Sequence, residues 1–215
     1  MQLNFCKRLL LFPYPPNLWR PWFIRNVIPH GIAPEFSFSR GPVNRVKAFA
    51  YVGTFSELKG IHMLIAAFRR LSGAYTLELY GTGTDAYERQ LKQLAGNDQR
   101  VHFRGPVAFK RMPEIYRTHD CIVVPSLWYE TYNFVVREAI ATGCLVVASQ
   151  MGAMPEAIQE GKNGFLFKAG DEDALLNALE CAARFSGDGF PSRQPSTIEE
   201  ASKYEAIYRQ YVPIK

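Results

Sequence analysis

Apolar residues form two short continuous runs on either side of a helical pattern in the second half of the chain. The runs cover residues 121–124 and 145–148, and the pattern between them predicts a helix over residues 133–142 that ends at Gly143. Continuous apolar runs around a helix are typical of strands in a parallel sheet that is covered on both faces. This segment therefore predicts the strand–helix–strand unit around which the rest of the protein is organised.

The same alternation of strand and helix patterns continues through most of the chain. Apolar residues at helical spacing, as in Ile61, Leu64, Ile65, Phe68 and Leu71, predict a helix with one face against a core. Further strands are predicted at residues 48–52, 75–80, 101–103 and 165–167, and further helices from residue 85, over 110–117, after Asp171 and over 197–211. This order predicts an α/β, Rossmann-like domain with three layers around a parallel sheet.

The length of the chain suits one sizeable domain with two flanking segments. A chain of 215 residues that is 47% hydrophobic is long enough to bury one real core. We predict a domain over residues 27–186, an N-terminal remnant or extension over residues 1–26, and a linker with a C-terminal helix over residues 187–215. No apolar run reaches the roughly 18 residues that a membrane-spanning helix needs.

Charge and cysteine content narrow the class of protein only loosely. The formal net charge of +5 suits an anionic ligand or membrane surface, but it is also ordinary for a soluble protein. The four cysteines show no C-x-x-C spacing and the four histidines form no ligand cluster, so we predict no metal site. Inert thiols indicate a cytoplasmic location, while Trp19, Trp22 and Phe23 leave peripheral membrane contact open. No nucleic-acid partner is expected.

Two carboxylates eight positions apart are the main candidates for chemistry. Glu130 precedes the predicted helix over residues 133–142 and Glu138 lies inside it. Ligands of parallel sheets bind at the carboxyl ends of the strands, where Glu130 lies, and the free N–H groups of a first helical turn suit an anion such as a diphosphate. One carboxylate can then hold the hydroxyl groups at one end of a sugar nucleotide, and the other carboxylate those at the opposite end. The alternative is a solvated Glu130 with Glu138 paired to Arg137.

The residues around this pair resemble the retaining nucleotide-sugar glycosyltransferases of family four, which have the GT-B fold. The resemblance runs in unbroken order over about residues 27–183 and matches the C-terminal half of such an enzyme. The matching short segments are Val52-Gly53, Lys59-Gly60, Gly81-Thr82-Gly83, Val101-His102-Phe103, Pro125-Ser126, Glu130, Glu138-Ala139, Gly143, Val146-Val147-Ala148-Ser149, Gly152, Pro155-Glu156, Asn163-Gly164 and Gly170-Asp171.

The resemblance implies roles in donor binding for particular residues. It places Glu130 at the donor hexose as the catalytic carboxylate and Glu138 at the ribose. It places Asn133 and Phe134 at the helix start that receives the diphosphate. In the loops it implies that Lys59 is a phosphate ligand, that Thr54 stands where many members have a second, arginine ligand, and that Val107 receives the nucleobase through its backbone.

The resemblance also implies partners and leaves alternatives open. It implies a nucleotide-sugar donor, a glycan or lipid acceptor, no cofactor, and an N-terminal acceptor domain or subunit that this chain lacks. A GT-B sugar-nucleotide epimerase shares the nucleotide site, and a non-catalytic interaction domain can keep the fold alone. An NADP-dependent oxidoreductase is a further alternative, because Gly81, Gly83 and Ala86 fit a dinucleotide fingerprint and Arg104 suits a 2′-phosphate.

Overall fold

The computed structural model describes residues 28–36, 38, 45–187 and 194–211. Residues 1–26, including the aromatic residues considered for membrane contact, lie outside the described residues, as does most of the predicted linker. The chain divides into two compact units, residues 35–193 in one and residues 1–34 with 194–215 in the other. The three-part division drawn from the sequence stays a prediction.

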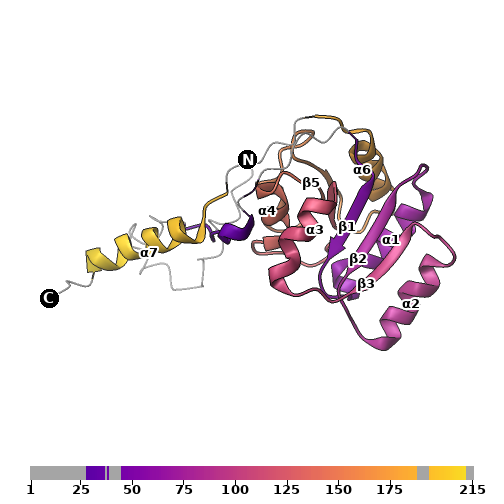
Figure 1. Ribbon diagram of the computed structural model, residues 1–215, viewed down its shortest axis with the longest axis horizontal. Coiled ribbons are helices and arrows are strands. Elements are labelled where there is room, and N and C mark those ends of the chain that lie inside the picture. The colour runs from indigo at the N-terminus through magenta and orange to yellow at the C-terminus, as the bar shows by residue number, and fades with distance from the viewer. Residues whose placement is uncertain (1–27, 37, 39–44, 188–193, 212–215) are drawn as a thin grey trace, which may run out of the picture. The chain divides into compact units, whose positions relative to one another are not determined.

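Six parallel strands form the sheet of the larger unit, in the order β3-β2-β1-β4-β5-β6 (Figure 1). Phe49 and Ala50 of β1 pair with Cys121 and Ile122 of β4, and the strand order reverses at this central pairing. The parallel sheet predicted from the apolar runs is confirmed. The strands are β1 (Ala48–Val52), β2 (Thr76–Tyr80), β3 (Val101–Gly105), β4 (Cys121–Val124), β5 (Leu145–Ser149) and β6 (Gly164–Phe167).

Helices cover both faces of the sheet, which confirms the three-layer arrangement (Figure 1). One face carries α1 (Ile61–Arg70), α2 (Asp85–Ala95) and α6 (Glu172–Arg184). The other carries α3 (Met112–Thr118), α4 (Phe134–Ala141) and the short α5 (Met154–Ala157). Three 3₁₀ helices, η4 (Pro34–Phe36), η5 (Glu57–Lys59) and η6 (Phe109–Arg111), lie in connecting segments.

The burial of the central strands explains why their sequences are apolar without interruption. Successive side chains of a strand point to opposite faces of the sheet. Val123 and Val147 lie in the core under α1 and α6, while Ile122 and Val146 are buried outside that core, on the other face. A strand covered on both faces favours apolar residues along its whole length, and β4 and β5 are buried throughout, with Ser149 as the polar residue at the end of β5.

Several element boundaries differ from the prediction. The helix predicted over residues 110–117 consists of η6 followed by α3, because Pro113 lies in the first turn of α3 and cannot continue a helix from before it. β3 extends to Gly105, two residues beyond the predicted end. The helix predicted from residue 133 begins at Phe134, with Asn133 as its N-cap.

The smaller unit joins the segment before the domain to the last helix, α7 (Thr197–Tyr211), whose limits match the prediction. Ile32 and Ser196 form an isolated parallel bridge. Glu200 accepts a hydrogen bond from the backbone N–H of Gly31 at 2.7 Å and contacts Nδ1 of His30 at 3.0 Å. The backbone donor, followed by His30, lowers the pKa of Glu200.

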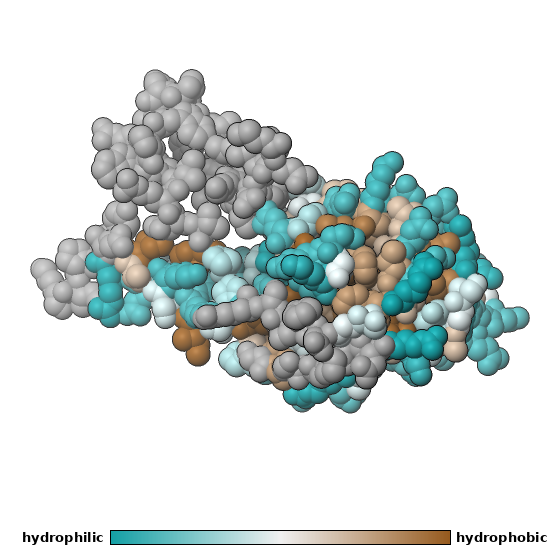
Figure 2. Space-filling view, turned by 90° about the horizontal axis from the view of Figure 1, so that it is seen from above, coloured by the Kyte–Doolittle hydropathy of each residue, from teal (hydrophilic) through white to brown (hydrophobic). Residues whose placement is uncertain are grey.

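Hydrophilic residues form the rim of the visible face of the larger unit, with hydrophobic residues in smaller patches between them (Figure 2). In the part of the chain that the structure describes, no helix has both the length and the apolar character needed to span a bilayer.

Close approach of neighbouring loops fixes the carboxyl end of the sheet. Gly60 has a φ of 67°, and a Cβ there would lie 2.0 Å from the carbonyl oxygen of Pro125. Gly152, with a φ of 61°, would place a Cβ 2.0 Å from the carbonyl oxygen of Glu130. The loops after β1, β4 and β5 are therefore packed backbone against backbone.

Replacement of Gly60 by alanine tests this packing. We expect Gly60→Ala to lower the free energy of unfolding by the roughly 1–2 kcal/mol of a left-handed backbone, plus a clash penalty of about 1–3 kcal/mol. Gly161→Ala is the matched control, because Gly161 has a φ of 71° and a Cβ added there would meet no atom within 4 Å. Equal losses for the two variants in urea unfolding would show that the loops do not constrain one another.

Candidate functional site

The reversal of strand order between β1 and β4 leaves two loops that diverge at the carboxyl end of the sheet. In open α/β sheets this is the place where ligands bind. The loops nevertheless touch, because the carbonyl oxygen of Leu58 accepts hydrogen bonds from the N–H groups of Leu127 and Trp128 at 2.8 and 3.1 Å. Side chains from both loops therefore face a common site.

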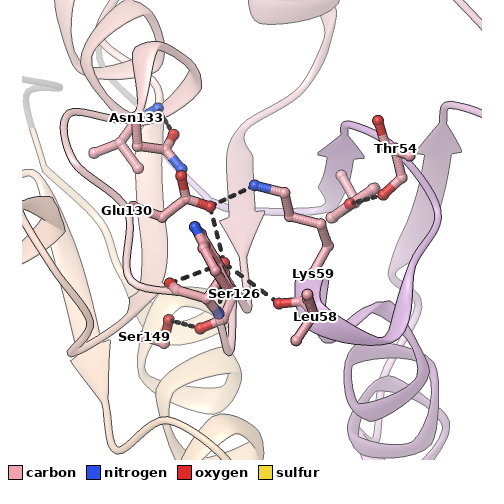
Figure 3. Close-up of polar contacts among 10 residues, drawn as sticks. Thr54, Leu58, Lys59, Ser126, Glu130, Asn133 and Ser149 are labelled. Carbon is pink, nitrogen blue, oxygen red and sulfur yellow. Dashed lines mark hydrogen bonds and ion pairs between the residues drawn. The ribbon is translucent and has the colours of Figure 1, made fainter.

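Lys59 and Glu130, 71 positions apart in sequence, meet at this site (Figure 3). Nζ of Lys59 lies 2.6 Å from Oε1 of Glu130, and the side chains are 35% and 13% exposed. In the structure Lys59 ends η5, just before α1 begins, and its ammonium pairs with Glu130 from the β4 loop.

Hydrogen bonds of two serine residues also hold Glu130 in place. Ser126 Oγ donates to Oε1 of Glu130 at 2.9 Å, and Ser149 Oγ donates to the carbonyl oxygen of Ser126 at 2.5 Å (Figure 3). Ala153 N–H donates to the carbonyl oxygen of Glu130 at 2.8 Å. From the sequence alone, Ser126 and Ser149 have no assigned role, although both belong to the segments that resemble the family. No local pattern shows that these two serine side chains reach Glu130.

The start of α4 borders the same site. Asn133 has a φ of 58° and a ψ of 89°, and its side-chain oxygen accepts the N–H of Val136 at 3.1 Å. Among described residues other than glycine it alone has a positive φ, and such strain clusters at functional sites. Phe134 is 47% exposed and its ring packs edge-on against Tyr132 at 5.0 Å. The cap turns the chain so that the first turn of α4 follows directly on the Glu130 loop.

Glu138 lies deeper, between α4 and α3. It is 5% exposed and accepts a hydrogen bond at 2.8 Å from the hydroxyl of Tyr116, which is fully buried. Burial raises the pKa of Glu138 to about 7, and the Tyr116 hydrogen bond opposes the rise. The alternative pairing with Arg137 is wrong, because the Arg137 guanidinium lies over the Tyr132 ring at 4.1 Å.

Thr54 and Val107 lie apart from the pair of Lys59 and Glu130. The carbonyl oxygen of Thr54 accepts the Tyr51 hydroxyl at 2.8 Å, and Thr54 lies on the side of Lys59 away from Glu130 (Figure 3). Val107 follows β3 and helps to line a cavity of about 110 Å³. The structure therefore gathers Lys59, Glu130 and Asn133, and it leaves the roles of Thr54 and Val107 as predictions.

The geometry speaks against the dinucleotide-binding alternative. The Gly83 N–H and the Thr82 hydroxyl donate to Oε1 of Glu88 at 2.9 and 2.7 Å, so the protein's own carboxylate occupies the start of α2 where a pyrophosphate would bind. Arg104 forms an ion pair with Glu78 at 2.6 Å. The fingerprint residues therefore serve the packing and capping of α2.

No group of three or more His, Cys, Asp or Glu side chains with the geometry of a metal site occurs among the described residues. The positive charge available at the carboxyl end of β1 and β4 comes from Lys59 and from the first turn of α4.

Comparison with known proteins agrees with this arrangement. The family described as "Glycosyl transferases group 1" matches residues 46–184 of the 215. D-inositol 3-phosphate glycosyltransferase of Corynebacterium urealyticum is 33% identical over 144 residues, which are 62% of this chain and 34% of that protein. The chain thus spans about a third of the length of this relative.

Two solved structures show the same fold. Sucrose-phosphate synthase from Thermosynechococcus elongatus superposes with a TM-score of 0.73 at 25% identity, covering 86% of this chain and 52% of that one. HepE of Anabaena, solved in complex with UDP-glucose, superposes with a TM-score of 0.72 at 22% identity, covering 87% and 58%. The partial coverage fits the C-terminal domain of a two-domain GT-B enzyme, and the matched residues show that this chain belongs to the group 1 glycosyltransferase family.

Proposed function

We propose that this chain binds the nucleotide diphosphate sugar donor of a retaining glycosyltransferase. The observation that carries the proposal is the meeting of Lys59 and Glu130 at the β1/β4 switch point, beside the start of α4. The site then offers a cation and helix N–H groups for a diphosphate, and a carboxylate for sugar hydroxyls. The family match and the UDP-glucose bound to HepE support this interpretation.

The ends of the donor extend from the diphosphate in opposite directions. Glu138 takes the ribose hydroxyls from inside α4, and Glu130 takes the hexose hydroxyls from the loop. A diphosphate competes with Glu130 for the Lys59 ammonium, so the ion pair opens when the donor binds. In the proposed reaction the bond between the anomeric carbon and the diphosphate oxygen breaks. The acceptor oxygen bonds to that carbon on the same face, and its proton passes to the departing diphosphate.

Lys59 and the first turn of α4 stabilise the negative charge of the leaving diphosphate. Electrostatic stabilisation of this kind usually contributes more to catalysis than any other single effect. It needs no metal ion and no cofactor, and we propose that the reaction uses neither.

The acceptor is held by another domain or subunit. Large hydrophobic side chains are exposed on the segments around the site, namely Leu58 at 54%, Trp128 at 56%, Tyr129 at 47% and Phe134 at 47%. Such exposure beside a polar site is typical of a surface that another molecule covers. We propose a glycan or lipid acceptor, as in cytoplasmic polysaccharide biosynthesis.

The separate roles of the two carboxylates are testable with Glu130→Gln, which keeps a side-chain oxygen to accept the hydrogen bond from Ser126. We expect binding of the nucleotide sugar to weaken by about 1–3 kcal/mol, the range for a lost charged hydrogen bond. Binding of the nucleoside diphosphate should stay equal or tighten, because Lys59 no longer has a competing partner. The measurement is calorimetry with whichever of UDP, GDP and ADP gives the largest thermal shift.

Glu172→Gln is the matched control, because Glu172 forms an ion pair with Arg70 at 3.2 Å on the exposed surface of α6. Equal weakening of both ligands by Glu130→Gln would contradict a role at the hexose.

The raised pKa of Glu138 predicts a pH dependence of nucleotide binding. Below a pKa of about 7 the carboxyl is protonated and accepts ribose hydroxyls less well, so affinity should fall as the pH drops from 8 to 6. Glu138→Gln should remove this component and leave only the titration of the nucleotide itself. Identical pH profiles for the two proteins in calorimetry would show that Glu138 does not contact the ligand.

The purified chain should bind a nucleotide sugar and hydrolyse it slowly at most. An acceptor held against the donor lowers the barrier by about 7–11 kcal/mol, and this part of the site is proposed to come from elsewhere. Turnover with a simple acceptor near the typical enzyme rate of about 10 per second would refute the need for a second domain. Product analysis in the same assay separates transfer from epimerisation of the sugar nucleotide.

A further inference from the structure

Tyr116 on α3 is a fully buried side chain that has no role in the donor site as proposed above. Its hydroxyl lies 2.8 Å from Oε2 of Glu138 and donates to it. Tyr116 is 22 positions from Glu138 in sequence, so the contact exists only because α3 and α4 lie on the same face of the sheet.

The tyrosine is itself held firmly. Its ring packs edge-on against Phe36 with 5.6 Å between centroids, and Phe36 is fully buried. Its carbonyl oxygen accepts a hydrogen bond from the Cys144 thiol at 2.9 Å, immediately before β5. A buried ring with these neighbours keeps its hydroxyl in one place. The hydroxyl is therefore a fixed point from which the Glu138 carboxylate can be aligned.

The hydrogen bond engages only one carboxylate oxygen. Oε2 of Glu138 is bound to Tyr116, and Oε1 takes no part in this bond. A glutamate has three rotatable side-chain bonds, so an unanchored carboxylate would lose conformational freedom each time a ligand bound. Anchoring Oε2 to the tyrosine removes that cost in advance and leaves Oε1 for a ligand.

We propose that Tyr116 is a positioning residue that aligns Glu138 for the hydroxyl groups of a nucleotide ribose, an inference that rests on the proposed function. Tyr116 does not touch the ligand. It acts on the orientation of Glu138, and through it on the preference for ribonucleotides over deoxyribonucleotides.

Among the described residues, few other groups that titrate or carry charge face the pair of Tyr116 and Glu138. The Cys144 thiol faces Tyr116 from the start of β5, and Arg137 of α4 turns to the Tyr132 ring. Burial is the main cause that raises the pKa of Glu138, and the Tyr116 hydrogen bond is the cause that lowers it. Removal of the hydroxyl alone should therefore raise that pKa further.

The test compares the parent chain with Tyr116→Phe, which keeps the ring against Phe36. The probes are UDP and 2′,3′-dideoxy-UDP, or the GDP or ADP pair if that base gives the larger thermal shift. We expect Tyr116→Phe to weaken the ribonucleotide about tenfold, as for a lost hydrogen bond to a charged group, and to leave the dideoxynucleotide unchanged. In a Glu138→Ala background, where no side-chain oxygen remains to accept the Tyr116 hydroxyl, the same substitution should have little effect on either nucleotide.

Tyr87→Phe is the matched control, because the Tyr87 hydroxyl contacts Nδ1 of His62 at 2.9 Å and the side chain is 8% exposed on α2. Loss of ribonucleotide affinity by this variant too would indicate a general effect of removing a tyrosine hydroxyl. Equal weakening of ribo- and dideoxynucleotide by Tyr116→Phe, or persistence of the effect without Glu138, would reduce Tyr116 to a packing residue and overturn the proposal.

A ligand-free measurement separates this inference from the proposed function. Titration of the Glu138 carboxyl by carbon NMR should show a higher midpoint in Tyr116→Phe than in the parent chain. If the midpoint does not move, Tyr116 does not anchor Glu138, whatever the chain binds. If the midpoint rises but the parent chain binds no nucleoside diphosphate, the proposed function fails and the role at the ribose fails with it, while the anchor itself stands.

Discussion

The close contact between the loops after β1 and β4 is the constraint on which the site depends. The Leu58 carbonyl oxygen accepts two N–H groups from the β4 loop, and Gly60 lies against Pro125 with no room for a side chain. This contact brings Lys59 to Glu130 at 2.6 Å. Two strands that pair in parallel at a reversal of strand order would otherwise leave their loops free to separate. The site is thus a consequence of backbone packing before it is one of side-chain chemistry.

Two pairs of polar side chains lie near this contact, one partly exposed and one buried. Near the surface, the partly exposed Lys59 and Glu130 form an ion pair that solvent weakens and that a stronger anion can displace. Deeper, the buried Glu138 is held by the neutral hydroxyl of Tyr116, and burial keeps its pKa near 7. In the proposed function, the outer pair exchanges with a diphosphate and the inner pair gives a fixed geometry for uncharged hydroxyl groups.

The same packing explains why one sequence signal was misleading. The glycines after β2 fit a dinucleotide fingerprint, but the loop pairs with the β1 loop through Phe55 N–H and the Thr82 carbonyl oxygen at 2.8 Å. Glu88 then takes the N–H of Gly83 that a pyrophosphate would need. A glycine pattern indicates that backbones approach closely, and it does not indicate whether the neighbour is a ligand or another loop.

The sequence alone determined the parallel sheet and its layers, because uninterrupted apolar runs such as those of β4 and β5 have few other uses. It also singled out Glu130 and Glu138 as candidate site residues, and their roles stay a prediction. The pattern of the sequence also predicted both ends of α7 correctly. Only the tertiary structure decided the partners. Lys59 and Glu130 are 71 positions apart, Tyr116 and Glu138 are 22 apart, and Ser149 reaches Glu130 only through Ser126. Periodicity indicates which residues face a core or a helix end, whereas contacts between loops depend on strand order and register, which no local pattern encodes.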